Sequence, residues 1–286
     1  GPAGYGAYLD AGASRNIILR STVTSNSPYA ALYLSSGSVN IVQTSYVVGS
    51  TAVYILASTG TTIGGSVLVG TNTFGTALWF SSGNVTLTVS STIFTGGARG
   101  AGAFLDYGSQ GLIRLSTNTI LPASRYGVYL TTQVAGAKIW LASNTILGSV
   151  GTGFDRYGVY LDGLMTGATI LNNAIYYRAS GTMGANTAYA LYVKSASGIV
   201  IEKNRINNPG MITGGSFYGA YFSDADNLRF KFNDVHSSAP ALTNAFLLRA
   251  SEGSVNMTVK NNIFASSFTV PGASSGTLVI GAGSTS

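Results

Sequence analysis

The sequence predicts an all-β protein that forms a single solenoid, in which a short unit winds repeatedly around one axis. Three observations support this fold class. A four-residue phrase of small, aliphatic and aromatic residues returns every 21 to 32 residues along the chain. A second aliphatic phrase that ends in a polar residue follows it about ten residues later. Both phrases alternate with the period of a strand, and none has the period of a helix.

The first phrase predicts one strand in each turn of the solenoid. Examples are GAYL at 6–9, ALYL at 31–34 and GVYL at 127–130, and the longer phrase RYGVYL occurs at both 125–130 and 156–161. Because side chains of a strand alternate between its two faces, the aliphatic residues are expected to point inward. The Gly or Ala and the aromatic residue are then expected to point outward. The aromatic residues are Tyr8, Tyr33, Tyr54, Trp79, Phe104, Tyr129, Tyr160, Tyr192 and Tyr221.

The second phrase predicts another strand followed by a tight turn with a stacked polar column. Clear examples are IRLSTNTI, IWLASNTI and IVIEKNRI, in which a polar residue follows two inward aliphatic residues. Side chains stacked in this way hydrogen-bond from turn to turn and satisfy buried polar groups. The expected members are Thr22, Thr44, Asn72, Thr92, Asn118, Asn144, Asn173, Asn204, Asn233 and Asn262.

These repeats resemble those of the right-handed parallel β-helix proteins of the pectate-lyase-like superfamily. The resemblance covers essentially the whole chain and implies a right-handed parallel β-helix of about ten turns plus a partial eleventh. It is specific for the fold but not for function, because the superfamily includes lyases, hydrolases, tail spikes and adhesins.

Composition indicates a secreted or cell-surface protein. Only 8% of the residues are charged, and the net charge of +6 comes from few acids rather than from a run of bases. The scattered bases argue against nucleic-acid binding, and no apolar run is long enough for a membrane span. The chain has no cysteine and one histidine, His236, so we expect no metal site and no cofactor.

Residues 1–286 are interpreted as one β-helix domain. Gly1 and Pro2 match the remnant of a cleaved tag, and neither end shows a polar cap. We therefore expect the chain to be an excerpt of a longer protein. Open strand edges at the ends predict end-to-end self-association.

The aromatic column is the first candidate binding site. Flat rings flanked by small residues suit polysaccharide or a protein partner, and the proposed contacts are Tyr54, Trp79, Phe104, Tyr129, Tyr160 and Tyr192. In the alternative interpretation, the rings stack on one another and stabilise the sheet.

Arg125 and Arg156 begin the twin phrases and are expected to lie in register on adjacent turns. Two guanidinium groups beside tyrosines suit a carboxylated or sulfated sugar. Alternatively, both arginines face water, one of them paired with Asp155.

Catalysis is the competing hypothesis, in which the protein is a polysaccharide lyase or glycoside hydrolase. Asp106 and Asp162 are the weak candidates, since both fall in one outward column two turns apart, at about 9.6 Å. Paired acids of glycosidases lie within about 9.5 Å of each other. Both residues, however, precede a glycine or lie near one at a strand end, where Asp favours a turn, and Lys194 is placed to pair with Asp162. The resemblance also implies a calcium-binding acid cluster for a lyase, whereas the only close acids are Asp224 and Asp226. The sequence therefore favours a non-catalytic stalk or adhesin.

The connections before the first strand phrase lengthen in the later turns, as in GSVGTGFD and NNPGMITGGSF. Adjacent long loops form a ridge, where solenoids often carry function. His236 is placed in this ridge. The alternative is loop drift in a non-catalytic rod.

Overall fold

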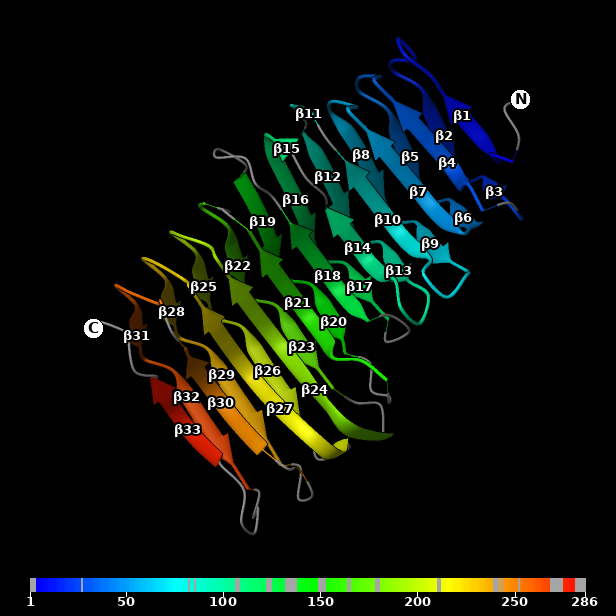
Figure 1. The fold of residues 1–286 in the computed structure, drawn as a ribbon. Helices are drawn as coiled ribbons and strands as arrows, with labels where there is room; N and C mark the ends of the chain where they lie inside the picture. Colours follow the sequence, from blue (N-terminus) through cyan, green and yellow to red (C-terminus); the bar gives the residue numbers. More distant parts are fainter. Residues whose placement is uncertain are drawn as a thin grey trace.

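The structure is a computed structural model in which three parallel sheets run the length of a rod (Figure 1). The description covers residues 4–26, 28–81, 83–84, 86–105, 109–121, 125–131, 138–148, 153–163, 166–177, 181–209, 212–238, 242, 244–251, 253–267 and 275–280. Each turn of the chain adds one strand to each sheet, so that β1 lies at one end of the rod and β33 at the other. The all-β class and the parallel β-helix are therefore confirmed.

Sheet A is formed by the first strand phrase. Its eleven strands are β1 (Ala7–Leu9), β4 (Ala30–Ser35), β7 (Thr51–Leu56), β10 (Thr76–Ser81), β14 (Ala101–Leu105), β18 (Tyr126–Thr131), β21 (Arg156–Asp162), β24 (Gly181–Lys194), β27 (Ile212–Ser223), β30 (Asn244–Ala250) and β33 (Ser275–Ile280).

Sheets B and C are formed by the second phrase, which contains two strands separated by a corner. Sheet B contains β2 (Ile17–Leu19), β5 (Ile41–Gln43), β8 (Thr61–Gly64), β12 (Leu87–Ser90), β16 (Leu112–Ser116), β19 (Lys138–Ala142), β22 (Thr169–Leu171), β25 (Val200–Glu202), β28 (Arg229–Lys231) and β31 (Thr258–Lys260). Sheet C contains β3 (Thr22–Thr24), β6 (Tyr46–Gly49), β9 (Val67–Gly70), β13 (Ile93–Thr95), β17 (Thr119–Ile120), β20 (Thr145–Leu147), β23 (Ala174–Tyr176), β26 (Arg205–Asn208), β29 (Asp234–Ser237) and β32 (Ile263–Ser266). A short extra pair joins β11 (Gly83–Asn84) to β15 (Ser109–Gln110).

The core is a continuous apolar column inside the three sheets. In sheet A, the predicted inward residues such as Leu32, Val53 and Leu130 are buried, with 0% exposed surface. Sheets B and C contribute residues such as Ile63 and Ile146, which are also completely buried. Alternation along each strand thus predicts the core, because one face of every strand is turned away from water.

The Gly or Ala of the first phrase was predicted to point outward, and this prediction is wrong. These residues are buried, and they are Ala31, Ala52, Ala77, Gly102, Gly127, Gly158, Ala190 and Gly219. A Cβ added to Gly127 would lie 2.7 Å from Cγ2 of Ile146, a core residue of sheet C. The strand pairing passes over Gly127, since Tyr126 pairs with Tyr157 and Val128 with Val159. Gly127 and Val128 therefore both face inward before the aromatic residue. A small residue is needed because strand and core approach closely here.

The polar column stacks at the corner between sheets B and C. Asn118 accepts hydrogen bonds at Oδ1 from Thr92 N, and its Nδ2 donates to Asn144 Oδ1 at 3.0 Å. The same pattern continues through Asn173, Asn204 and Asn233 to Asn262. The predicted amide ladder is therefore confirmed for its last seven members, from Thr92 to Asn262.

The first three members were predicted wrongly. Ser21, Ser45 and Ser66 occupy these places, since Ser21 N and Ser45 N donate to the hydroxyls of Ser45 and Ser66. Thr22 lies one residue too late, on β3, and Asn72 lies in the loop after β9. Thr44 lies one residue too early, at the corner itself.

The backbone at the corner between sheets B and C determines which residue enters the ladder. The residue before each ladder residue has a left-handed backbone, as at Thr44 (φ 50°), Ser143 (φ 56°) and Asn172 (φ 54°). This conformation costs about 1–2 kcal/mol for a residue with a side chain. It turns the chain from sheet B to sheet C and directs the next side chain into the stack, where its hydrogen bonds offset that cost.

The described residues include no helix with the length and apolar character needed to cross a membrane.

Candidate functional site

The predicted aromatic column lies in register on the outer face of sheet A. Tyr33 pairs with Tyr54, Tyr54 with Trp79, and the register continues to Tyr221 and then to Arg249. Neighbouring ring centroids in this column are 4.9–5.3 Å apart. The column is therefore a continuous row of ring contacts, which are tilted or edge-on from Tyr33 to Phe104 and stacked from Phe104 to Tyr192.

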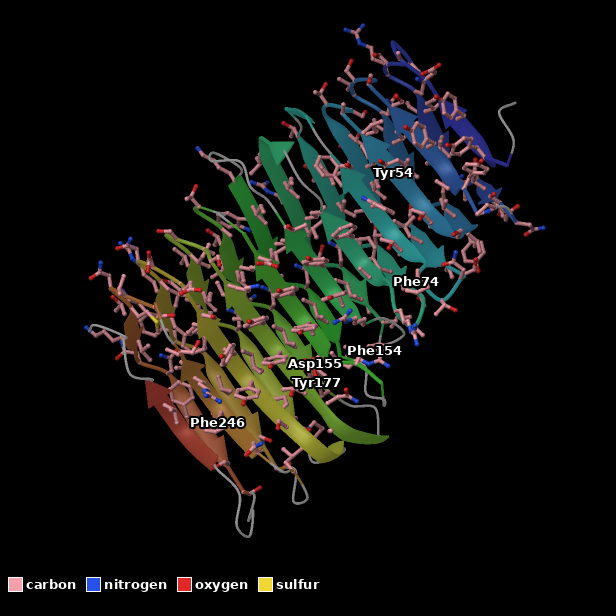
Figure 2. The ribbon with its side chains drawn as sticks, in the orientation of Figure 1. Tyr54, Phe74, Phe154, Asp155, Tyr177 and Phe246 are labelled. Atoms are coloured by element: carbon pink, nitrogen blue, oxygen red, sulfur yellow. The ribbon has the colours of Figure 1, made fainter. Side chains whose placement is uncertain are left out.

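A second aromatic column lies beside the first on the later strands. It consists of Tyr126, Tyr157, Tyr189, Tyr218 and Phe246, which are in register with one another. Figure 2 shows Phe246 on this sheet, far along the rod from Tyr54. This column was not predicted from the sequence, although an aromatic residue precedes each later first-column position by three residues. Strict alternation places these two positions on opposite faces of the strand. Here two consecutive inward residues lie between them, so both aromatic residues are on the outer face.

The two columns form one aromatic surface. Tyr126 and Tyr129 have ring centroids 4.6 Å apart, and Tyr157 and Tyr160 are 4.8 Å apart. Rings that are stacked at these distances cover one another's faces. From Phe104 to Tyr192, where the rings are stacked, the surface therefore offers mainly ring edges and hydroxyl groups to solvent, and the expectation of open ring faces is wrong there. The alternative, stacking that stabilises the sheet, agrees with this geometry.

Arg125 and Arg156 lie on adjacent strands, as predicted, because Tyr157 N donates to Arg125 O at 2.9 Å. Their side chains are placed differently. Arg125 is half-buried, with its guanidinium 5.0 Å from the centroid of Tyr126. Arg156 is only 6% exposed, and its Nη1 donates to Ala98 O. The expectation that both arginines face outward is therefore wrong for Arg156.

Arg156 is held in place by an aromatic ring in the preceding connection. Its guanidinium carbon lies 4.0 Å from the centroid of Phe154, while those of Arg99 and Arg125 lie at 5.5 and 5.7 Å. Burial lowers the pKa of Arg156, and the charge of Arg125 acts in the same direction. Figure 2 shows Phe154 and Asp155 together at one edge of sheet A. Asp155 Oδ1 accepts from Thr187 N at 2.7 Å on the next strand of this sheet.

Of the two weak catalytic candidates, Asp106 and Asp162, the structure describes only Asp162. Asp106 lies outside the described residues, so its distance from Asp162 is not part of the described geometry. Asp162 Oδ2 accepts a hydrogen bond from the Tyr160 hydroxyl at 2.9 Å. Lys194 is in register with Asp162. Among the described residues, however, the ion pair within 4.0 Å joins Arg205 and Asp234 and does not involve Lys194 or Asp162. No group of three or more metal-ligating side chains gathers in the part of the chain that the structure describes.

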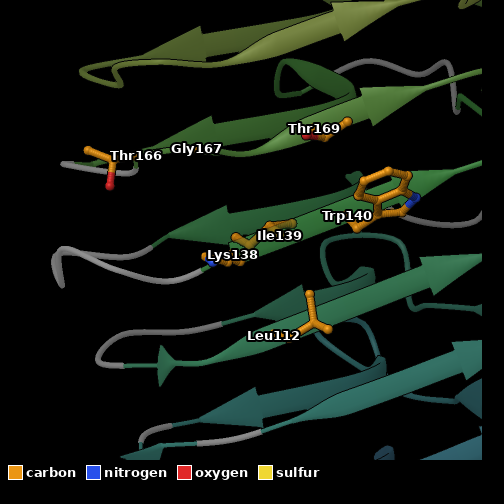
Figure 3. A pocket seen from close by; sticks show the side chains of 7 residues that line it. All are labelled: Leu112, Lys138, Ile139, Trp140, Thr166, Gly167 and Thr169. Atoms are coloured by element: carbon orange, nitrogen blue, oxygen red, sulfur yellow. The ribbon is translucent and has the colours of Figure 1, made fainter.

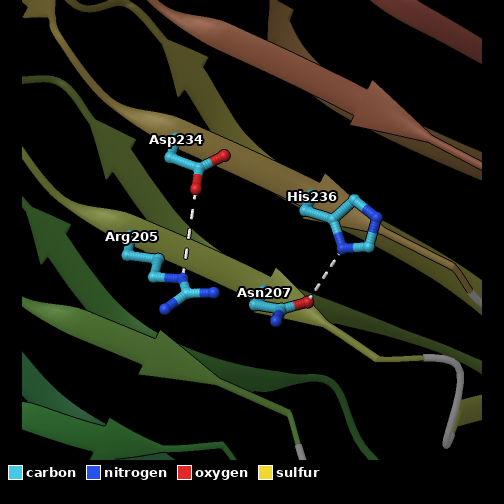
Figure 4. Close-up of polar contacts among 4 residues, drawn as sticks. All are labelled: Arg205, Asn207, Asp234 and His236. Carbon is cyan, nitrogen blue, oxygen red and sulfur yellow. Dashed lines mark hydrogen bonds and ion pairs between the residues drawn. The ribbon is translucent and has the colours of Figure 1, made fainter.

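The ridge of long connections falls partly outside the described residues, but His236 does not. It was placed in a loop, and this is wrong, because His236 lies on β29 of sheet C. Figure 4 shows its Nδ1 facing Asn207 Oδ1, at 3.2 Å, beside the ion pair of Arg205 and Asp234 at 4.0 Å. His236 thus takes part in a polar row between two neighbouring strands.

Burial of the aromatic surface predicts a loss of stability at high pH. Burial is the largest cause of the raised pKa in Tyr126, Tyr157, Tyr160, Tyr177, Tyr189 and Tyr192, and it raises the pKa of Tyr192 to about 12. In the unfolded chain these phenols ionise near pH 10. Between that pH and the folded pKa values, the unfolded state binds fewer protons than the folded state, so the free energy of unfolding falls as pH rises.

We therefore expect denaturation midpoints to be lower at about pH 11 than at about pH 9. Tyrosinate absorbance of these groups is expected to rise only together with unfolding, followed by the loss of strand circular dichroism. Full tyrosinate absorbance near pH 10 in a protein that keeps its strand signal would contradict this.

The chain matches one family model and is similar to several solved structures. The family model described as right handed beta helix region matches residues 1–146 and 135–283. The comparison with curated proteins found no match.

Three solved structures are similar to this chain. The enzymatically active domain of tailspike protein 2 of bacteriophage CBA120 has 12% identity and a TM-score of 0.48, over 96% of this chain and 41% of that one. PfbA, a surface adhesin of Streptococcus pneumoniae, has 13% identity and a TM-score of 0.49, over 93% and 71%. The A-module of mannuronan C-5 epimerase AlgE4 of Azotobacter vinelandii has 13% identity and a TM-score of 0.40, over 95% and 91%. The chain thus spans less than half of the tailspike domain.

Proposed function

Because this chain belongs to the family of right handed beta helix regions, we propose that it is a rigid, non-catalytic rod of the stalk or adhesin type. It binds polysaccharide through the outer face of sheet A. The observation that carries this proposal is the pair of aromatic columns, which place rings side by side on consecutive strands.

The stacked rings present their hydroxyl groups in rows. Strands are spaced by about 4.8 Å, so each row repeats donors and acceptors at that interval. From β18 to β27, where both columns consist of tyrosines, a polysaccharide chain laid along the rod meets phenol hydroxyl groups on every turn. The stack also fixes the rings before binding, which keeps the entropy cost of binding low.

Three described carboxylates at the ends of sheet A strands have partners within the fold. Asp162 accepts from Tyr160, and Asp155 accepts from Thr187 N. Asp10 accepts from Ala11 N at 2.7 Å. These contacts support structural roles for the carboxylates and agree with a non-catalytic rod.

The composition supports a place outside the cell or on its surface. Few residues are charged, while Ser, Thr, Asn and 17 tyrosines supply neutral polar groups. A neutral, hydroxylated surface suits contact with hydrated polysaccharide, in which hydroxyl groups also predominate.

Removing hydroxyl groups without disturbing the stack tests this function. The triple variant Tyr157→Phe, Tyr189→Phe, Tyr192→Phe keeps every ring, and Phe104 and Phe246 already occupy these columns. Calorimetric titration with neutral, carboxylated and sulfated polysaccharides is expected to give binding to the wild-type protein that the triple variant weakens at least about tenfold, or about 1.4 kcal/mol. The control is Tyr46→Phe, at an exposed tyrosine of sheet C.

Two outcomes would overturn the proposal. One is no binding to any of the three polysaccharide classes, and the other is equal binding by the wild type and the triple variant. Release of reducing ends or unsaturated products during the titration would instead establish an enzyme.

A further inference from the structure

The outer face of sheet B is basic, although the bases that form it are scattered in the sequence. Its strands place five cationic side chains on this sheet and one carboxylate, that of Glu202. The cations are Arg114, Lys138, Arg229, Lys231 and Lys260, of which all but the half-buried Lys231 are exposed. Such a surface attracts polyanions.

A depression of about 440 Å³ lies on the same face, within the size range of small-ligand sites. Leu112, Lys138, Ile139, Trp140, Thr166, Gly167 and Thr169 line it. Figure 3 shows that these residues come from three neighbouring turns, with the indole of Trp140 standing beside Thr169. Trp140 is 37% exposed and belongs to none of the aromatic columns of sheet A.

The two faces of the Trp140 ring have different neighbours. On the preceding strand, Arg114 is in register with Trp140, and its guanidinium carbon lies 5.9 Å from the ring centroid. On the following strand, Trp140 is in register with Thr169, and Gly167 lies just before it. Thr169 and Gly167 are small and leave room for the depression beside the indole. Trp140 lines this depression and is 37% exposed, whereas the tyrosines of sheet A contact one another.

We propose that the outer face of sheet B binds an acidic polysaccharide, with the Trp140 depression as the subsite for one uronate ring. The apolar face of the sugar stacks on the indole, as aromatic rings in binding sites accept flat apolar surfaces. The sugar carboxylate pairs with the ammonium group of Lys138, which lines the depression, while Arg114 on the other side of the indole adds to the positive charge of this face. Arg229, Lys231 and Lys260 continue the cationic surface along the rod.

This site is separate from the proposed polysaccharide surface on sheet A and does not depend on it. Its recognition rests on charge and on one partly exposed indole ring. The surface of sheet A rests on rows of hydroxyl groups. The two can therefore be tested by different variants and different ligands.

The probe is a polygalacturonate oligomer, and its fully methyl-esterified form is the uncharged control. The chain contains two tryptophans, Trp79 on sheet A and Trp140 on sheet B. Binding of the acid form is expected to change tryptophan fluorescence in the wild type and in Trp79→Phe, which copies Phe104. Trp140→Thr copies Thr169 in the same column, and it is expected to lose this change and at least about tenfold in affinity.

Charge variants complete the test. Lys138→Gln is expected to weaken binding about tenfold, whereas Lys194→Gln on sheet A is expected to have no effect. The triple Tyr→Phe variant of sheet A is also expected to bind the acid oligomer as the wild type does, so failure of one proposal is distinguishable from failure of the other.

Three results would overturn the inference: equal affinity for the acid and the methyl ester, unchanged binding by Trp140→Thr, or binding of duplex DNA or anionic vesicles as tight as that of the oligomer. The last result would indicate a general polyanion surface without a sugar subsite.

Discussion

Replacement of Asn173 by leucine is expected to lower the free energy of unfolding by about 3 kcal/mol. Asn173 is 1% exposed, and its Nδ2 donates to Leu141 O at 2.9 Å and to Asn204 Oδ1 at 3.0 Å. Its Oδ1 accepts from both N and Nδ2 of Asn144, each at 2.9 Å. Leucine leaves these buried groups without a partner, and each unsatisfied group costs about 1–3 kcal/mol.

The matched control is Asn72→Leu. Asn72 was predicted to belong to the same column, but it is exposed in a loop, where its Nδ2 donates to Ser50 Oγ. A change of less than about 0.5 kcal/mol is expected there. Urea denaturation of the two variants measures the difference. If they are equally stable, the ladder contributes nothing specific to the fold.

Replacement of Tyr177 by alanine is expected to cost about 4 kcal/mol, because it removes a large ring from a packed core. Tyr177 is completely buried and lies edge-on to Phe217, with ring centroids 5.9 Å apart. Its hydroxyl donates to Tyr189 O at 2.7 Å. Its ring also fills the space over Gly148, where an added Cβ would lie 2.5 Å from the ring.

Tyr177→Phe separates packing from hydrogen bonding. It keeps the ring and removes the hydroxyl that donates to the carbonyls of Tyr189 and Arg156, so a cost of about 1–2 kcal/mol is expected. The control is Tyr46→Ala, at an exposed residue of sheet C, with less than about 0.5 kcal/mol. Denaturation midpoints give the order of the variants, and hydrogen exchange is expected to increase first in β20, β23 and β26. A Tyr177→Ala protein as stable as the wild type would show that the core refills the space.

The sequence predicts the rod and its core because each inward residue is followed by an outward one over almost every strand. It fails where this alternation is interrupted. Gly127 and Val128 both face inward, so Tyr126 and Tyr129 share a face that a strict period of two assigns to only one of them. A strand with two inward residues between two outward ones contains the same kinds of apolar residue as a strand that alternates strictly, so the sequence does not distinguish them. The local backbone at Gly127 follows from its close contact with Ile146 of sheet C.

The polar ladder shows a different limit of sequence reasoning. Asparagine identifies the later members, because its amide is the group that stacks. Serine and threonine are common throughout this chain, so Ser45 and Thr44 cannot be separated by residue type. The left-handed backbone of Thr44 separates them, and this is a property of the corner.

The candidate sites were predictable only in part. The first aromatic column follows from the repeat itself. The basic face of sheet B does not, since Arg114 and Lys260 are distant in sequence and are brought onto one sheet by winding. The burial of Arg156 was also not predicted, because its twin Arg125 is followed by the same five residues but is only half-buried. The difference lies before the phrase, where Phe154 packs on the Arg156 guanidinium.

The twin phrase RYGVYL, at 125–130 and 156–161, has a genetic consequence. The two copies are paired strand to strand, Tyr126 with Tyr157 and Tyr129 with Tyr160. Deletion or duplication of the 31 residues from one copy to the next removes or adds one turn and leaves an intact phrase at the junction. Asn118 is then followed in the ladder by Asn173, with the loss of Asn144 alone. Rod length can therefore change by whole turns, about 4.8 Å each, without any change of register in the remaining strands.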